Sequence, residues 1–148
     1  MRLKSKKIRQ RTREGRATQA DMAAVVTVVT QQVVDGLKQR MADLNVRGTM
    51  APGHLVFSVI DFIQHARTDT PTYGDATCLF RYLKNRLGED FTRHVFMIKL
   101  PRGNSTYRTP TMTLQGLHTL LPLLGDKVEP EFRRIFEEVY HTIVRSEE

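Results

Sequence analysis

Residues 95–107, VFMIKLPRGNSTY, decide the fold class that the sequence predicts. The six residues before Pro101 are apolar except for Lys99, which is typical of a short strand. Pro101-Arg-Gly-Asn104 then provides turn chemistry, because proline presets the backbone and glycine accepts a positive φ. A return strand through Tyr107 would complete a β-hairpin. The segments on both sides of this hairpin have helical patterns, so we expect a small helical α+β domain with a wing-like hairpin.

The helix predicted before the hairpin starts at a cap formed by Asp75 and ends at Gly88, which suits the left-handed position after a helix. Its apolar side chains recur at helical spacing and form one arc, composed of Ala76, Leu79, Phe80, Leu83 and Leu87. Arg81 and Asn85 lie four residues apart on the opposite face, with Lys84 on its flank. The pattern therefore predicts an amphipathic helix with a polar, basic outer face.

Two helices are predicted after the hairpin. Thr113 can cap the first, over residues 114–124, although Pro122 must kink or end it. The second begins near Pro130, a favourable first helical residue, and has the clearest pattern in the chain. Its large apolar residues recur every three or four positions: Phe132, Ile135, Phe136, Val139, Tyr140, Ile143 and Val144. We expect this helix to supply a large part of the core.

The compact domain is predicted to begin near His54. All eleven phenylalanine and tyrosine residues lie at or after Phe57, and aromatic side chains dominate the energetics of a core. Residues 54–57 form a strand-like run, and Ser58 followed by Asp61 resembles a capping box that opens a short helix through about Ala66. Met50-Ala51-Pro52-Gly53 is a natural linker. The predicted organisation is therefore a helix and linker over residues 17–53 and a globular domain over residues 54–148.

A long helix is predicted over residues 19–44. The apolar residues at positions 22, 26, 29, 33, 37, 41 and 44 follow steps of three and four. The β-branched run Val25–Thr30 favours a strand instead, but the length and the flanking residues favour a helix. This apolar stripe must cover either the globular domain or the same stripe of a second copy, which would give a homodimer or a larger assembly.

The net charge of +7 comes from the first sixteen residues, a basic arm with eight cations and one acid. Its cations are Arg2, Lys4, Lys6, Lys7, Arg9, Arg11, Arg13 and Arg16. Such an arm gains most by neutralising DNA or another polyanion, because each phosphate contact releases condensed counterions. The alternatives are a solvated tail, a nuclear import signal and a contact with acidic lipids.

A second basic region covers residues 81–108, where seven basic residues face two acidic ones. Arginine reads guanine and asparagine reads adenine by paired hydrogen bonds, while cations on a wing grip the phosphate backbone. We therefore assign nucleic-acid binding to six further residues: Arg81, Lys84, Asn85, Lys99, Arg102 and Arg108. The alternative for these residues is an ordinary solvated helix face and a polar hairpin tip.

The sequence offers little for catalysis or for a cofactor. The five histidines are scattered, and no HExxH, P-loop, GxGxxG or GxSxG motif occurs. We therefore expect no enzyme, no catalytic residue, no metal and no cofactor. The lone Cys78 excludes an intramolecular disulfide and favours a reducing compartment, nuclear or cytoplasmic. No apolar run reaches the roughly 18 residues that a membrane span requires, so no membrane partner is expected.

The order of these motifs resembles the Bro-N and KilA-N group of DNA-binding domains from large DNA viruses and phage antirepressors. The similar parts are Phe57-Ser-Val-Ile-Asp61-Phe62, Phe80 with Leu83-Lys84, the hairpin, Thr113-Leu-Gln-Gly116-Leu117-His-Thr-Leu120-Leu121, and the terminal helix from Glu131 to Arg145. The resemblance runs over about residues 54–146 and leaves the first 53 residues outside it. It implies DNA binding without catalysis, commonly in transcription regulation, and adds the virion or the host nucleus as locations.

These observations predict a non-enzymatic DNA-binding protein that uses its arm and a surface of helix plus hairpin. The alternative is a structural or adaptor subunit of a larger assembly. In that case the basic arm would contact nucleic acid or an acidic partner, and the globular body would bind protein.

Overall fold

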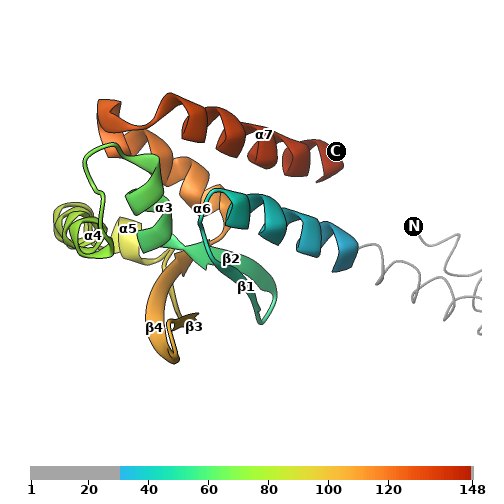
Figure 1. Cartoon of the computed structure of the whole chain (residues 1–148), viewed down its shortest axis with the longest axis horizontal. Helices are drawn as coiled ribbons and strands as arrows, with labels where there is room; N and C mark the ends of the chain where they lie inside the picture. The colour runs from blue at the N-terminus through green and yellow to red at the C-terminus, as the bar shows by residue number, and fades with distance from the viewer. Residues whose placement is uncertain (1–30, 148) are drawn as a thin grey trace, which may run out of the picture. The chain divides into compact units, whose positions relative to one another are not determined.

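The computed structural model describes residues 31–147, and their side chains as far as Thr142. The chain divides into two units, Met1–Gly36 and Leu37–Glu148. The second unit combines helices with an antiparallel sheet of four strands (Figure 1). The predicted fold class, a small α+β domain with a hairpin, is confirmed.

Residues 31–43 are helical and precede the elements of the sheet. In chain order the elements that follow are β1 (Gly48–Ala51), β2 (His54–Ser58), α3 (Val59–Ala66), α4 (Tyr73–Leu87), α5 (Glu89–Thr92), β3 (Phe96–Arg102), β4 (Ser105–Met112), α6 (Leu114–Leu120), the 3₁₀ helix η1 (Leu121–Lys127) and α7 (Pro130–Glu147). The strand order in the sheet is β1-β2-β4-β3, and every neighbouring pair is antiparallel.

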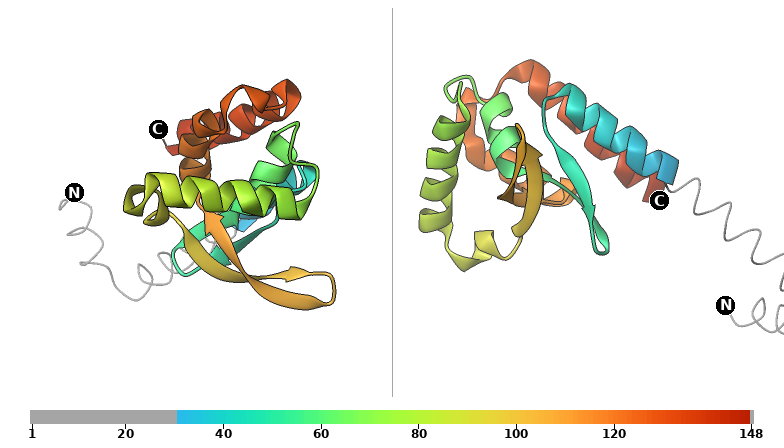
Figure 2. Two further views of the ribbon diagram at one scale, coloured as in Figure 1. Left: turned by 90° about the vertical axis from the view of Figure 1, so that its left-hand side faces the viewer. Right: turned by 60° about the horizontal axis from the view of Figure 1, so that its bottom comes forward.

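The predicted hairpin is formed by β3 and β4, which extend away from the helices (Figures 1 and 2). Its turn is the pair Gly103-Asn104, with φ +67° at Gly103, a value that glycine tolerates best. The return strand is longer than predicted, because β4 continues past Tyr107 to Met112 and there pairs with β2.

Residues 50 and 51, predicted to start a linker, belong to β1, and that prediction is wrong. β1 pairs with β2 from Gly48 opposite Phe57 to Ala51 opposite His54. Pro52 and Gly53 form the turn between the two strands. The compact unit therefore starts well before His54, at Leu37. The start predicted from the position of the first aromatic residue was too late, because the first core residues are aliphatic. Met41, Leu44 and Val46 are all buried.

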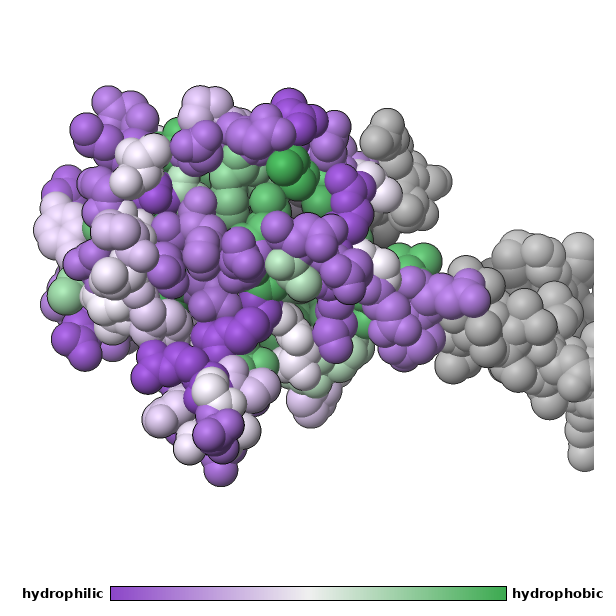
Figure 3. Space-filling view, viewed as in Figure 1, coloured by the Kyte–Doolittle hydropathy of each residue, from purple (hydrophilic) through white to green (hydrophobic). Residues whose placement is uncertain are grey.

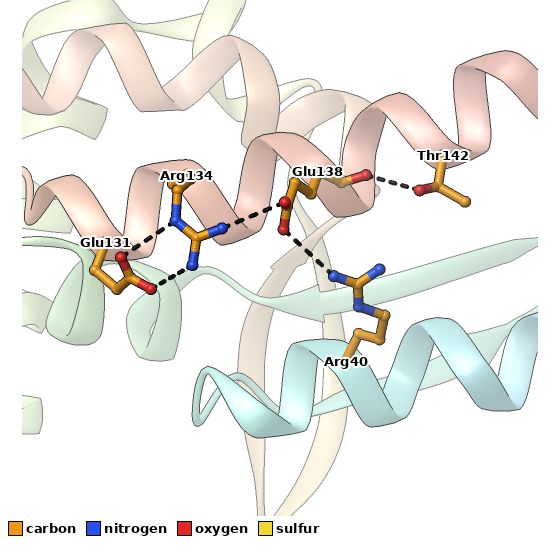
Figure 4. A network of polar contacts seen from close by, with 5 residues as sticks. All are labelled: Arg40, Glu131, Arg134, Glu138 and Thr142. Carbon is orange, nitrogen blue, oxygen red and sulfur yellow. Dashed lines mark hydrogen bonds and ion pairs between the residues drawn. The ribbon is translucent and has the colours of Figure 1, made fainter.

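The helix predicted over residues 19–44 is present in its described part, residues 31–43, and residues 19–30 lie outside the described residues. Its apolar stripe continues into the core through Leu37, Met41 and Leu44. The same stretch lies beside α7, where an Arg40 guanidinium nitrogen is 3.8 Å from a Glu138 carboxylate oxygen (Figure 4). The C-terminal part of the stripe therefore packs on the domain, which is one of the two arrangements that we expected.

The helix caps agree with the sequence except at α4. Ser58 caps α3 as predicted, since its hydroxyl accepts a hydrogen bond from the Asp61 backbone N–H. The N-cap of α4 is Thr72 rather than Asp75, which instead closes a capping box as the third helical residue. α6 is capped by Thr113 and ends at Leu120, before Pro122 enters η1. The short helix α5 was not predicted.

α7 supplies the centre of the core, as its periodicity predicts. Phe132 and Phe136 pack edge-on against Phe62 of α3, with ring centroids 5.3 and 4.9 Å apart. Val139 is fully buried on the same face of the helix. The side chains of Ile143 and Val144 lie outside the described residues. This core packs the helices against one end of the sheet. The hairpin extends beyond this core and forms a surface together with α4.

Candidate nucleic-acid interface

α4 and the β3–β4 hairpin form the two walls of an open groove of about 490 Å³. The view on the left of Figure 2 shows α4 crossing above the hairpin. α4 contributes Tyr73, Thr77, Phe80, Arg81 and Lys84, and the hairpin contributes Met97, Arg102, Tyr107, Arg108 and Pro110. Two basic segments that are separated along the chain therefore meet at one surface.

The wall formed by α4 is held in place by its apolar face. Ala76, Phe80 and Leu83 are buried against the core, and Leu79 and Leu87 pack partly against it. Arg81, Lys84 and Asn85 are consequently exposed, as the sequence predicts. Arg81 and Lys84 line the groove, whereas Asn85 does not. The predicted pair of Arg81 and Asn85 thus divides between the groove and the outer face of the helix.

In the hairpin wall, the register of the two strands determines the face from which each basic side chain projects. Lys99 lies directly opposite Arg108, so the two side chains project from the same face of the hairpin. Both are exposed, but Arg108 lines the groove and Lys99 does not. Arg102, at the end of β3, has its guanidinium 4.5 Å from the ring centroid of Tyr73 and 4.8 Å from that of Tyr107. These cation–π contacts fix Arg102 at the mouth of the groove.

Arg47, the residue before β1, anchors the hairpin to the body. Its backbone N–H and guanidinium donate to the carboxylate of Asp61, with a shortest distance of 2.7 Å from Nε to Oδ2. The third guanidinium nitrogen, Nη1, donates to the Pro101 carbonyl oxygen at 2.6 Å. The hydrogen bond to Asp61 is the largest cause of a raised pKa of Arg47. Arg47 therefore stays charged and fixes the end of β3 relative to α3.

The groove carries positive charge without local compensation. Among the described residues, no aspartate or glutamate lines it. The ion pairs in this part of the chain involve other cations, such as Arg93 with Asp90 and Arg134 with Glu131. Arg81, Lys84, Arg102 and Arg108 take part in none of these pairs. On the face shown in Figure 3, hydrophilic side chains gather around the hairpin. An anionic ligand would therefore find four cations on two walls.

Sequence reasoning found the cations of this groove and missed its aromatic and apolar residues. Tyr73, Met97 and Tyr107 line the groove. The signal was present, because Tyr107 stands beside Arg108 in the wing, but aromatic residues were assigned to the core. The eight basic residues of the predicted arm, from Arg2 to Arg16, lie outside the described residues.

Other chemistry is sparse in the described part of the chain. It contains no group of three or more His, Cys, Asp or Glu side chains placed to hold a metal ion. Across residues 31–147, no helix combines the length and the apolar content that a bilayer crossing requires. A second open cavity, of about 530 Å³, lies between the end of α4 and α6 and is lined by both apolar side chains, such as Phe91 and Leu120, and polar ones, such as Asp90.

Comparisons with protein-family models, with curated proteins and with solved structures find no match for this chain. The similarity to Bro-N and KilA-N domains therefore stays a prediction from short sequence motifs.

Proposed function

We propose that this protein is a non-enzymatic DNA-binding protein with a regulatory role, and that α4 and the β3–β4 hairpin form its contact surface. The observation that carries the proposal is the set of four cations on the two walls of the groove, with no carboxylate among its described lining residues. Phosphates are the natural partners of such a surface, because each contact releases a counterion from the DNA.

The roles of the individual residues follow from their positions. Arg102 and Arg108 contact phosphates from the hairpin, and Lys99 adds a cation beside Arg108 on the same face of the hairpin. Arg81 and Lys84 contact the strand from α4, and Arg81 also reaches a base edge from the groove, whereas Asn85 contacts the nucleic acid from the outer face of the helix. The basic arm adds phosphate contacts that do not depend on the sequence of the DNA.

The test is a fluorescence-anisotropy titration of the full chain against duplex DNA at two salt concentrations. Two double variants each remove one wall's charge: Arg81→Ala with Lys84→Ala, and Arg102→Ala with Arg108→Ala. Each phosphate that is no longer neutralised should make the negative slope of log K against log salt shallower by about 0.9, with weaker binding at both concentrations. We expect both double variants to show this effect.

The matched control is Lys127→Ala with Arg133→Ala, which removes the same charge at two exposed residues outside the groove. It should leave most of the binding intact. Equally weakened binding in all three double variants would reduce the proposal to a general charge effect. Absence of duplex binding even at low salt would contradict it and favour the structural or adaptor role.

A further inference from the structure

The floor of the groove is apolar, which phosphate binding alone does not require. Ile60 and Phe80 are almost fully buried at its base. Met97 and Tyr107 are 45% and 48% exposed on the hairpin wall. A surface that binds only a phosphate backbone has no use for exposed apolar side chains between its cations. These side chains therefore favour a ligand that has an apolar face as well as negative charge.

The arrangement of the cations leaves an aromatic surface available. The guanidinium of Arg102 covers one face of the Tyr107 ring, at 4.8 Å from its centroid. A planar group can stack on the other face or against Met97. The volume of the groove, about 490 Å³, falls in the range of about 300–1,000 Å³ that is common for small-ligand pockets. The groove therefore has room for one planar ring together with its attached charged groups.

On the basis of the proposed function, we infer that the groove binds an unpaired nucleobase of a single-stranded nucleic acid. The base stacks on the Tyr107 ring, which is 48% exposed, and the neighbouring phosphates contact the cations on the two walls. A duplex cannot supply such a base, because its bases are paired and stacked with their faces covered. Single strands offer that face at every nucleotide, so the binding is tolerant of sequence.

The test compares three labelled probes on the full chain: a thymine homopolymer strand, an abasic strand of the same length, and a duplex. The abasic strand keeps the phosphates and removes the bases. We expect the thymine strand to bind about ten-fold more tightly than the abasic strand, since stacking of a base on an aromatic side chain has this magnitude. Tyr107→Ala should remove most of this difference, and Tyr107→Phe should retain it.

Tyr82→Ala is the matched control, because Tyr82 is a tyrosine of similar exposure, 54%, that does not line the groove. It should leave the preference for the thymine strand unchanged. A thymine strand with 5-iodouracil gives a second readout, since irradiation should cross-link it to the hairpin at Tyr107 or Met97. The cross-linked peptide is identified by mass spectrometry.

The outcomes separate the two proposals. Equal binding of the thymine and abasic strands, or an unchanged preference in Tyr107→Ala, overturns the base-binding inference. If only the duplex binds, and the groove cations are still required, DNA binding stands and the base-binding site fails. If the duplex does not bind even at low salt, the proposed function itself fails, whether or not the single strands bind.

Discussion

At the scale of single residues, Asp61 joins three parts of the fold. It is 6% exposed, and its two carboxylate oxygens accept hydrogen bonds from the backbone and side chain of Arg47. Arg47 also donates to the carbonyl of Pro101. The pair therefore connects the first turn of α3, the start of β1 and the end of β3. The sequence suggested a capping box at Asp61, but its carboxylate binds Arg47 because the distant segment brings a stronger donor.

Replacing Asp61 by asparagine should destabilise the protein by about 2–3 kcal/mol, because an amide accepts fewer hydrogen bonds and leaves the guanidinium without its counter-charge. A fully buried pair would cost roughly 3–5 kcal/mol, but the Arg47 side chain remains 28% exposed. Urea denaturation measures the change. Adding Arg47→Met to Asp61→Asn should recover part of the stability, because the unpaired charge is then absent. A stability unchanged by Asp61→Asn would show that water compensates for the missing pair.

Asp69 provides a pH-dependent contribution to stability. Two guanidinium nitrogens of Arg67 donate to its carboxylate, at 2.7 and 2.6 Å, and these hydrogen bonds are the main cause of its lowered pKa. The folded state therefore binds the Asp69 proton less readily than the unfolded state does. The stabilisation is complete above the ordinary aspartate pKa and is lost as the pH falls through the lower folded value.

Asp69→Asn should therefore be less stable than the wild type at neutral pH, and the difference should shrink as the pH falls below the ordinary aspartate pKa and the carboxylate becomes protonated. Urea denaturation at several pH values tests this. In an Arg67→Met background the same substitution should show a smaller pH dependence, because only the backbone hydrogen bond and Lys127 then lower the pKa of Asp69. A difference that stays constant down to the acid end would mean that the carboxylate does not titrate as described.

At the scale of elements, local patterns predicted most of the fold. The periodicity of α7, the Gly103 turn and the apolar arc of α4 are encoded within one element, so the sequence alone was sufficient. β1 was missed because it is short and has little strand character of its own. Its position depends on pairing with β2, where the close approach of Gly48 to the Phe57 ring leaves no room for a Cβ atom. Such contacts between elements carry no local signal.

Phe136→Ala tests how much of the core depends on α7. Phe136 is fully buried and packs on Phe62, so its truncation should leave a cavity and cost about 3–5 kcal/mol. The exposed neighbour Arg133 serves as the control, since Arg133→Ala should change the stability by less than about 0.5 kcal/mol. Thermal or urea denaturation of both variants gives the comparison. If both substitutions change the stability equally and only slightly, α7 does not supply the centre of the core.

At the scale of the whole molecule, the groove could be predicted only in part. The basic residues of α4 and of the hairpin were identified from charge and spacing. Their meeting at one groove, and the presence of Tyr73 and Tyr107 between them, depend on how the sheet and helices pack. The domain boundary shows the same limit, because Met41 and Val46 enter the core only through tertiary packing. A fragment that starts at His54 would lack these residues and β1.

The basic arm is therefore best tested by deleting residues 1–16 alone. The compact unit begins at Leu37, so the deletion should leave the melting temperature unchanged. Duplex affinity should fall for all DNA sequences, because phosphate contacts carry no sequence information. The negative slope of log K against log salt should become shallower by about 0.9 for each phosphate that the arm neutralises in the wild type.

A full-length variant with the eight basic residues of the arm changed to glutamine separates charge from length, and it should behave like the deletion. Anisotropy titrations at several salt concentrations measure both variants. If affinity and slope are the same as in the wild type, the arm takes no part in binding, and the groove cations must account for the whole salt dependence. If the deletion weakens binding and the glutamine variant does not, the arm acts through its length or its apolar residues rather than through phosphate contacts.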